Sequence, residues 1–122
     1  MVTINQRVLK NHEDFEPPFL EEEASIKIEG LGSQKTLDSA KGLLPALGKI
    51  HRITHFRNGK KIIFHTYIEA DFNLLIKGGF TTNYTGVGPA AFQQFLAAAG
   101  LNQTHISSLS KDEEIVEIKI EF

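Results

Sequence analysis

The sequence predicts an α+β fold, a two-layer sandwich in which two helices cover one antiparallel or mixed sheet of four to six strands. The evidence consists of segments that alternate apolar and polar residues, segments with apolar residues at helical spacing, and an Asn-Gly pair between two β-prone runs. Their order is strand, helix, hairpin, strand, helix, strand, which is βαββαβ-like. The chain of 122 residues forms a single domain, 1–122, large enough to bury a core.

The N-terminal part begins with residues 2–9, which alternate only weakly. The next stretch, 11–23, is acidic, and Pro17 and Pro18 exclude a helix or an inner strand there, so we expect a loop or arm. Isoleucines then alternate with polar residues at 24–30, which predicts a half-buried strand closed by glycine.

Two helices follow from apolar residues at helical spacing. The first is expected over 34–44, with Ser33 as its cap and Pro45 marking its end. The second is expected over 89–99, with proline in its first position, Phe92, Phe95 and Leu96 on its apolar stripe, and Gly100 ending it.

The hairpin is expected from residues 50–57 and 60–68, joined by Asn58 and Gly59 in a type I′ turn. A further strand is expected at 72–76. The C-terminal segment predicts a last strand with one face in solvent. Its inward residues would be Val116, Ile118, Ile120 and Phe122, and its outward residues Glu117, Lys119 and Glu121.

Composition excludes several functions. The absence of cysteine removes disulfides, thiolate metal sites and thiol nucleophiles, and it suits a reducing compartment, so the cytoplasm is the expected location. No apolar run is long enough for a membrane span, and no signal peptide is visible. The net charge of −2 argues against a nucleic-acid-binding domain.

Neither a metal site, nor a cofactor, nor a catalytic centre is predicted. His51 and His55 have the spacing that chelates a metal on a helix, but on a strand they stand about 13 Å apart. No serine lies in a known nucleophile motif, and no histidine has a visible orienting partner. Enzymatic activity is therefore unsupported; a third hypothesis, an enzyme acting through His65 or Glu69, ranks last.

The glycine-rich segment 77–89 is the strongest candidate for ligand binding. Glycines there can turn backbone N–H groups inward, and the N-terminus of the following helix favours anions. The predicted ligand-binding residues are Tyr84, Thr85, Gly86 and Gly88: the backbone of 85–88 would receive the phosphate, and Tyr84 or Phe80 would stack on a base. The side chains that could add hydrogen bonds are Thr81, Thr82, Asn83 and Thr85. The alternative is a turn that only redirects the chain.

The basic hairpin would add charge to such a site. Arg52 and Arg57 are the candidates, because a guanidinium can grip a phosphate with two donors. With Asn58 and Gly59 as the turn, Arg52 would face His65 across the hairpin. The two arginines are five positions apart on the hairpin, so they lie on opposite faces and at most one joins a one-sided pocket.

The acidic arm supports a rival function. Phe15 and Phe19 would be apolar anchors, and Glu21, Glu22 and Glu23 would steer a protein partner. The alternative is a solvated linker that docks on its own sheet. The sequence therefore predicts a non-enzymatic binding protein for a phosphorylated small molecule or nucleotide; the rival is an immunity, inhibitor or adaptor module that uses this arm and the acidic C-terminal strand. The oligomeric state is left open.

Overall fold

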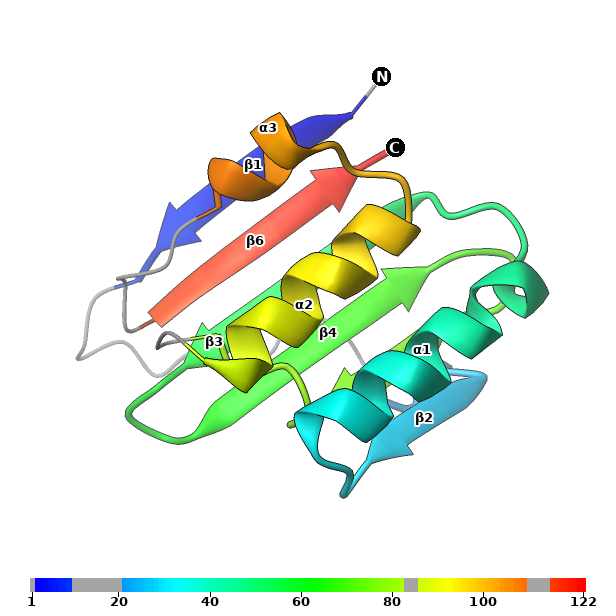
Figure 1. Cartoon of the computed structure of the whole chain (residues 1–122), viewed down its shortest axis with the longest axis horizontal. Helices are drawn as coiled ribbons and strands as arrows, with labels where there is room; N and C mark the ends of the chain where they lie inside the picture. Colours follow the sequence, from blue (N-terminus) through cyan, green and yellow to red (C-terminus); the bar gives the residue numbers. More distant parts are fainter. Residues whose placement is uncertain (1, 10–20, 83–85, 110–114) are drawn as a thin grey trace.

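The computed structural model describes residues 2–9, 21–82, 86–109 and 115–122. Six strands form one mixed sheet, with helices across one face, which confirms the predicted α+β sandwich (Figure 1). The strands are β1 Thr3–Val8, β2 Ile26–Glu29, β3 Arg52–Asn58, β4 Ile63–Glu69, β5 Leu74–Lys77 and β6 Ile115–Glu121. The helical segments are η1 Glu21–Glu23, α1 Ser33–Leu47, α2 Val87–Ala98 and α3 Gln103–Ser107.

The sheet has the order β1-β6-β3-β4-β5-β2. Each neighbouring pair is antiparallel except β2 and β5, which are parallel. The C-terminal strand β6 thus lies inside the sheet, between β1 and β3, and the two ends of the chain lie side by side (Figure 1). The α2 helix crosses the middle of the sheet, and α1 lies toward the β5 and β2 side (Figure 1).

The main core lies between the sheet and the helices. Ile53 of β3 pairs with Ile68 and Ile120 on its two neighbours, and all three are 0% exposed. Phe95 of α2 belongs to the same core cluster and is also 0% exposed. Each such side chain contributes about 1.5–3 kcal/mol by leaving water, so this layer is the main source of stability.

The predicted hairpin exists, but its turn and register are wrong. Asn58 pairs with Ile63, and the connection is therefore Gly59–Ile62 rather than Asn58 and Gly59. Asn58 Oδ1 accepts hydrogen bonds from the backbone N–H groups of Lys60 and Lys61, at 3.1 and 3.2 Å, and so closes the longer loop. A side-chain hydrogen bond thus outcompetes the local preference of Asn-Gly for a two-residue turn.

The shifted register moves the partners of β3 but keeps their faces. Arg52 pairs with Glu69, not with His65, and His65 pairs with Phe56. The shift is an even number of residues, so His65 still shares a face with Arg52. Arg57 lies on the face opposite to Arg52, as the sequence predicts, and this is the face toward the helices.

The loop of this hairpin carries backbone strain. Ile62 has φ of +56° and is 79% exposed, which is unfavourable for a β-branched residue by about 1–2 kcal/mol. We expect Ile62→Gly to raise the free energy of unfolding by about 1 kcal/mol, measured by urea denaturation. Ile63→Gly, in the adjacent strand position, should lower it, and a loss of stability in both variants would contradict the strain.

Two further expectations need correction. The first helix runs from Ser33 to Leu47, so Pro45 lies inside it and does not end it. Ser33 does not cap this helix, because its hydroxyl donates to the carbonyl of Gly79 at 2.8 Å. Gly32 is the N-cap, without a side-chain hydrogen bond.

The last strand is also more enclosed than expected. Val116, Ile118 and Ile120 are buried as predicted, but Phe122 lies beyond β6 and is 36% exposed. Glu117, expected in solvent, is 5% exposed because β1 pairs with β6 and covers it. Residues 2–9 alternate too weakly for β1 to be predicted from the sequence. The short helix α3 was not predicted either.

Candidate functional site

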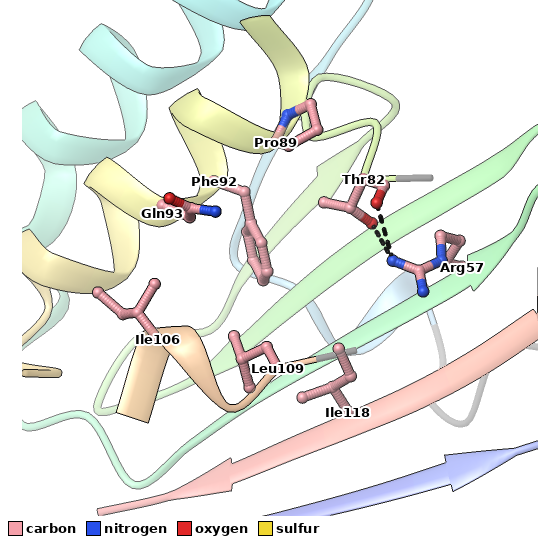
Figure 2. Close-up of a pocket in the computed structure, with 8 residues that line it drawn as sticks. All are labelled: Arg57, Thr82, Pro89, Phe92, Gln93, Ile106, Leu109 and Ile118. Carbon is pink, nitrogen blue, oxygen red and sulfur yellow. Dashed lines mark hydrogen bonds between the residues drawn. The ribbon is translucent and has the colours of Figure 1, made fainter. Parts of the chain in front are cut away.

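The candidate site lies between α2 and the helix-facing side of β3. Residues two apart on a strand share a face, so His55 and Arg57 both point toward the helices, and both are 0% exposed. The segment after β5 brings Thr82 to both of them. Figure 2 shows Arg57 and Thr82 on one side of a cavity whose other walls are apolar except for Gln93.

His55 is held by a hydroxyl at each ring nitrogen. Its Nδ1 lies 2.8 Å from Thr66 Oγ1 on β4, and its Nε2 lies 2.8 Å from Thr82 Oγ1. The ring also packs on Phe92 of α2, with 4.4 Å between the ring centroids. Burial, followed by the charge of Arg57 and then the influence of His65, lowers the pKa of His55 to about 3. The imidazole is therefore neutral at physiological pH.

Arg57 supplies a permanent positive charge at the same place. Its Nη1 donates to the carbonyl oxygen and to Oγ1 of Thr82, both at 3.0 Å. A guanidinium stays protonated at physiological pH, so the wall of the cavity carries this charge permanently.

The cavity has a volume of about 30 Å³, room for about two water molecules. Arg57 and Thr82 form a polar end, Gln93 lies on α2 across the cavity from them, and the rest of the lining is apolar (Figure 2). The apolar lining residues are Pro89, Phe92, Ile106, Leu109 and Ile118. A cavity with one polar end and an apolar lining suits a ligand that places a small charged group at that end.

The first turn of α2 fixes one wall of this cavity. Gly88 is buried, and its α-carbon lies so close to Thr81 that a Cβ would collide with the hydroxyl and carbonyl oxygens of Thr81. Ala90 N–H donates to the carbonyl of Gly86 at 3.2 Å, which is the first hydrogen bond of the helix. Pro89 therefore reaches the cavity because Gly88 permits a close approach.

The predicted ligand residues separate into three groups. Arg57 lines the cavity, whereas Arg52 lies on the other face of the sheet, where its Nε is 3.3 Å from Glu69. Gly86 is exposed and Gly88 is buried, and neither lines the cavity. Tyr84 and Thr85 lie outside the described residues, so their role stays a prediction.

One stacking expectation is wrong. Phe80 is 1% exposed and packs on Phe92 and Phe95, with ring centroids 5.6 and 5.4 Å away, so it belongs to the core and offers no face to a base. His55 and Phe92 were missed as site residues. His55 could have been found because it lies two positions from Arg57 on a strand and so shares its face. Phe92 could have been found because it belongs to the apolar stripe of the helix.

The contact between Thr82 and His55 has the distance of a nucleophile and its base, but its electrostatics oppose catalysis. A general base must become positively charged, and Arg57 beside it disfavours the imidazolium. Thr66, which orients the ring, carries no negative charge to compensate. The arrangement is better suited to binding than to proton transfer.

The neutral state of His55 makes stability depend on pH. Its pKa is about 3 in the folded protein and about 6.5 in the unfolded chain, so the unfolded state binds more protons in between. Stability should therefore fall as the pH drops through this window, with a contribution of at most about 1.4 kcal/mol per pH unit. We expect His55→Gln to flatten the dependence in urea titrations at several pH values; an unchanged slope would contradict the assignment.

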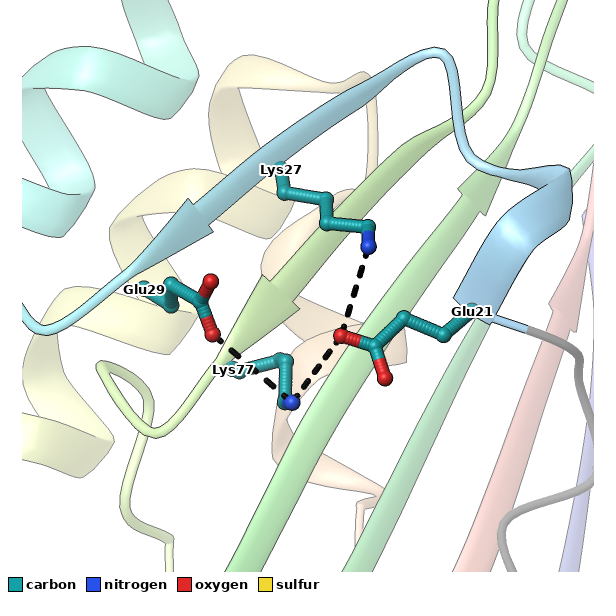
Figure 3. Close-up of polar contacts among 4 residues, drawn as sticks. All are labelled: Glu21, Lys27, Glu29 and Lys77. Atoms are coloured by element: carbon teal, nitrogen blue, oxygen red, sulfur yellow. Dashed lines mark hydrogen bonds and ion pairs between the residues drawn. The ribbon is translucent and has the colours of Figure 1, made fainter.

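The acidic arm makes contacts within its own chain at Glu21. Glu21 Oε1 lies 3.0 Å from Lys77 Nζ and 3.4 Å from Lys27 Nζ, and Lys77 also lies 3.7 Å from Glu29 (Figure 3). The hydrogen bond from Lys77, followed by the charge of Lys27, lowers the pKa of Glu21. Glu22 and Glu23 are exposed. Phe15 and Phe19 lie outside the part that the structure describes.

Within residues 2–9, 21–82, 86–109 and 115–122, no group of three His, Asp or Glu side chains is placed to hold a metal ion. In the same residues, no helix combines the length and the apolar character needed to cross a membrane.

Comparison of the chain with protein-family models, curated proteins and solved structures finds no match. The functional proposal therefore rests on the geometry of the site.

Proposed function

We propose that this chain is a non-enzymatic cytoplasmic binding protein for a small anionic molecule, of which a phosphorylated metabolite or nucleotide is the expected class. The observation that carries the proposal is the buried guanidinium of Arg57 in the wall of a cavity at the first turn of α2. Thr82, which Arg57 and His55 both contact, adds a hydroxyl at the same end.

The size of the cavity limits what enters it. With a volume of about 30 Å³, it takes an oxyanion group only after displacing water and adjusting its walls, and the rest of a ligand lies outside it. A guanidinium offers several donors in one plane, which matches the oxygens of a phosphoryl group. The residues predicted to receive the rest of the ligand, Tyr84 and Thr85, precede α2 in the chain.

The neutral pocket residues support binding rather than turnover. His55 is neutral at physiological pH, and its ring lies 2.8 Å from the Thr82 hydroxyl and holds it in place. The position of Thr82 is thus fixed before the ligand arrives. Preorganised donors cost little entropy on binding, which favours recognition of a small anion.

Isothermal titration calorimetry tests the proposal. Inorganic phosphate and a panel of nucleotides and sugar phosphates are titrated at low ionic strength, with uncharged nucleosides as the matched controls. We expect saturable one-to-one binding for at least one phosphorylated compound and none for its uncharged counterpart. Absence of heat with every phosphorylated compound would refute the proposal.

One specific observation favours the rival function, a protein-interaction module that uses the acidic arm. Glu22 and Glu23 project from η1 without burial, whereas Glu21 contacts Lys77 and Lys27. A partner with a basic surface would therefore meet Glu22 and Glu23 first. Pull-down with Glu22→Lys and Glu23→Lys distinguishes the two functions, because a steered protein partner would be lost while binding of a small anion would persist.

A further inference from the structure

Glu117 of β6 is a charged side chain in an enclosed position. Its side chain is 7% exposed, and its register partners on the two neighbouring strands are Arg7 of β1 and Phe56 of β3. Ile118, the next residue of β6, packs toward the helices, so Glu117 lies on the face of the sheet away from them. Because little water reaches this carboxylate, other charged or hydrogen-bonding groups must compensate its charge.

The contacts of Glu117 compensate its charge only in part. Its Oε2 lies 3.5 Å from Arg7 Nη2, and its Oε1 lies 3.7 Å from Lys119 Nζ. Charge-assisted hydrogen bonds to a carboxylate are about 2.7–2.9 Å long, so both ion pairs are loose. Within the part of the chain that the structure describes, Oε2 is buried and accepts no hydrogen bond. A carboxylate offers about four acceptor positions, so Glu117 has room for another donor.

A hollow lies beside Glu117 on the same pair of strands. Its volume is about 530 Å³, within the range of about 300–1,000 Å³ that is typical of small-molecule sites. The described side chains that line it are all polar or charged, and they come from β1 and β6: Asn5, Gln6, Arg7, Glu117, Lys119 and Glu121. The hollow therefore suits a small polar molecule that brings its own hydrogen-bond donors.

We propose that this hollow binds a free amino acid, whose protonated amine donates to Glu117 Oε2 and whose carboxylate contacts Lys119. The acidic and basic groups of the protein are neighbours, with 3.7 Å between Glu117 Oε1 and Lys119 Nζ, and the amine and carboxylate of an amino acid are neighbours as well. The side chain of Lys119 is 38% exposed, so its ammonium is within reach of a ligand. The cavity at Arg57 lies on the other face of β6, so the inference is independent of the proposed function.

The charges around the hollow fit a zwitterion better than a simple cation. Among the described residues that line it, two are acidic and two are basic, so together they carry no net charge. A simple cation would meet repulsion from Lys119, whereas the carboxylate of an amino acid is attracted to it. Asn5, the register partner of Lys119 on β1, adds an amide next to that carboxylate. The lining thus offers complementary groups to both ends of the ligand.

Titration of the unmodified protein with the standard amino acids, followed by the backbone amide signals in nuclear magnetic resonance, tests the proposal. The matched control is the hydroxy acid with the same side chain, in which a hydroxyl replaces the amine. We expect saturable shifts in β1 and β6 with at least one amino acid, and at least about tenfold weaker binding of its hydroxy acid. No saturable shift with any amino acid, equal affinity for the hydroxy acid, or shifts confined to α2, which lines the Arg57 cavity, would overturn the proposal.

Glu117→Gln assigns the binding to this carboxylate. Glutamine keeps the shape of the side chain and removes its charge, so we expect at least about tenfold weaker binding of the amino acid. Glu29→Gln is the matched control, because Glu29 lies on β2 at the other edge of the sheet, 3.7 Å from Lys77; affinity should stay within about twofold. Unchanged affinity in a folded Glu117→Gln variant, or equal losses in both variants, would overturn the assignment. If Glu117→Gln does not fold, the comparison of amino acid and hydroxy acid on the unmodified protein decides.

Discussion

Replacing Arg57 by methionine is expected to weaken binding of a phosphorylated ligand by about 10- to 100-fold. The loss corresponds to one or two charge-assisted hydrogen bonds to a buried charge, about 1.5–3 kcal/mol. Methionine keeps an unbranched apolar stem in the wall of the cavity, so the change removes charge rather than shape. Calorimetry with the tightest compound of the panel measures the effect.

Arg52→Met is the matched control for this experiment. Arg52 belongs to the same strand but lies on the other face, where it contacts Glu69. We expect affinity within about twofold of the unmodified protein, since one exposed ion pair is worth about 0–1 kcal/mol. Equal losses in both variants would show that general positive charge, and not the cavity, attracts the anion.

Folding of the Arg57→Met variant must be checked separately. Removing Arg57 leaves the carbonyl oxygen of Thr82 without this donor, so we expect the melting temperature to fall. Affinity is therefore compared at a temperature at which the variant is still folded, and a folded variant that no longer binds assigns the loss to the site. Unchanged affinity in a folded variant would contradict the proposed role of Arg57.

Gly88→Ala is expected to lower the free energy of unfolding by about 1–3 kcal/mol, the usual cost of forcing an extra carbon into a packed site. The added Cβ meets the backbone carbonyl of Thr81, which cannot rotate away, as well as its hydroxyl. The first turn of α2 must then shift, and Pro89 moves with it. Urea denaturation measures the change in stability.

Gly42→Ala is the control for this substitution. Gly42 lies within α1, is exposed, and has open space where a Cβ would stand. The replacement should raise the free energy of unfolding by about 0.5–1 kcal/mol, because alanine favours the helix. If Gly88→Ala were also stabilising, Gly88 would be an ordinary helical position and the wall of the cavity would not depend on it.

The elements with strong local signals could be predicted from the sequence. The phenylalanines of α2 repeat at helical spacing and all lie in the core, and the parity of β3 placed Arg52 and Arg57 on opposite faces. The register of the hairpin could not be predicted. It depends on the side chain of Asn58, which bonds the loop backbone and so replaces the short turn.

The centre of the site could not be predicted because it joins distant segments. Thr82 meets His55 and Arg57 across 27 and 25 residues of sequence. The histidine was weighed only as a metal ligand, since burial of a polar side chain leaves no local pattern in the sequence. Pairing of β1 with β6, which buries Glu117, is likewise a long-range effect.

Nuclear magnetic resonance of the arginine side chains tests the central claim most directly. The chain has three arginines, Arg7, Arg52 and Arg57, and their Nε–H signals can be assigned by substituting each with lysine. On titration with the phosphorylated ligand, the account predicts a saturable shift of the Arg57 signal while those of Arg7 and Arg52 stay in place. A shift confined to Arg7 or Arg52, with Arg57 unmoved at saturation, would contradict it.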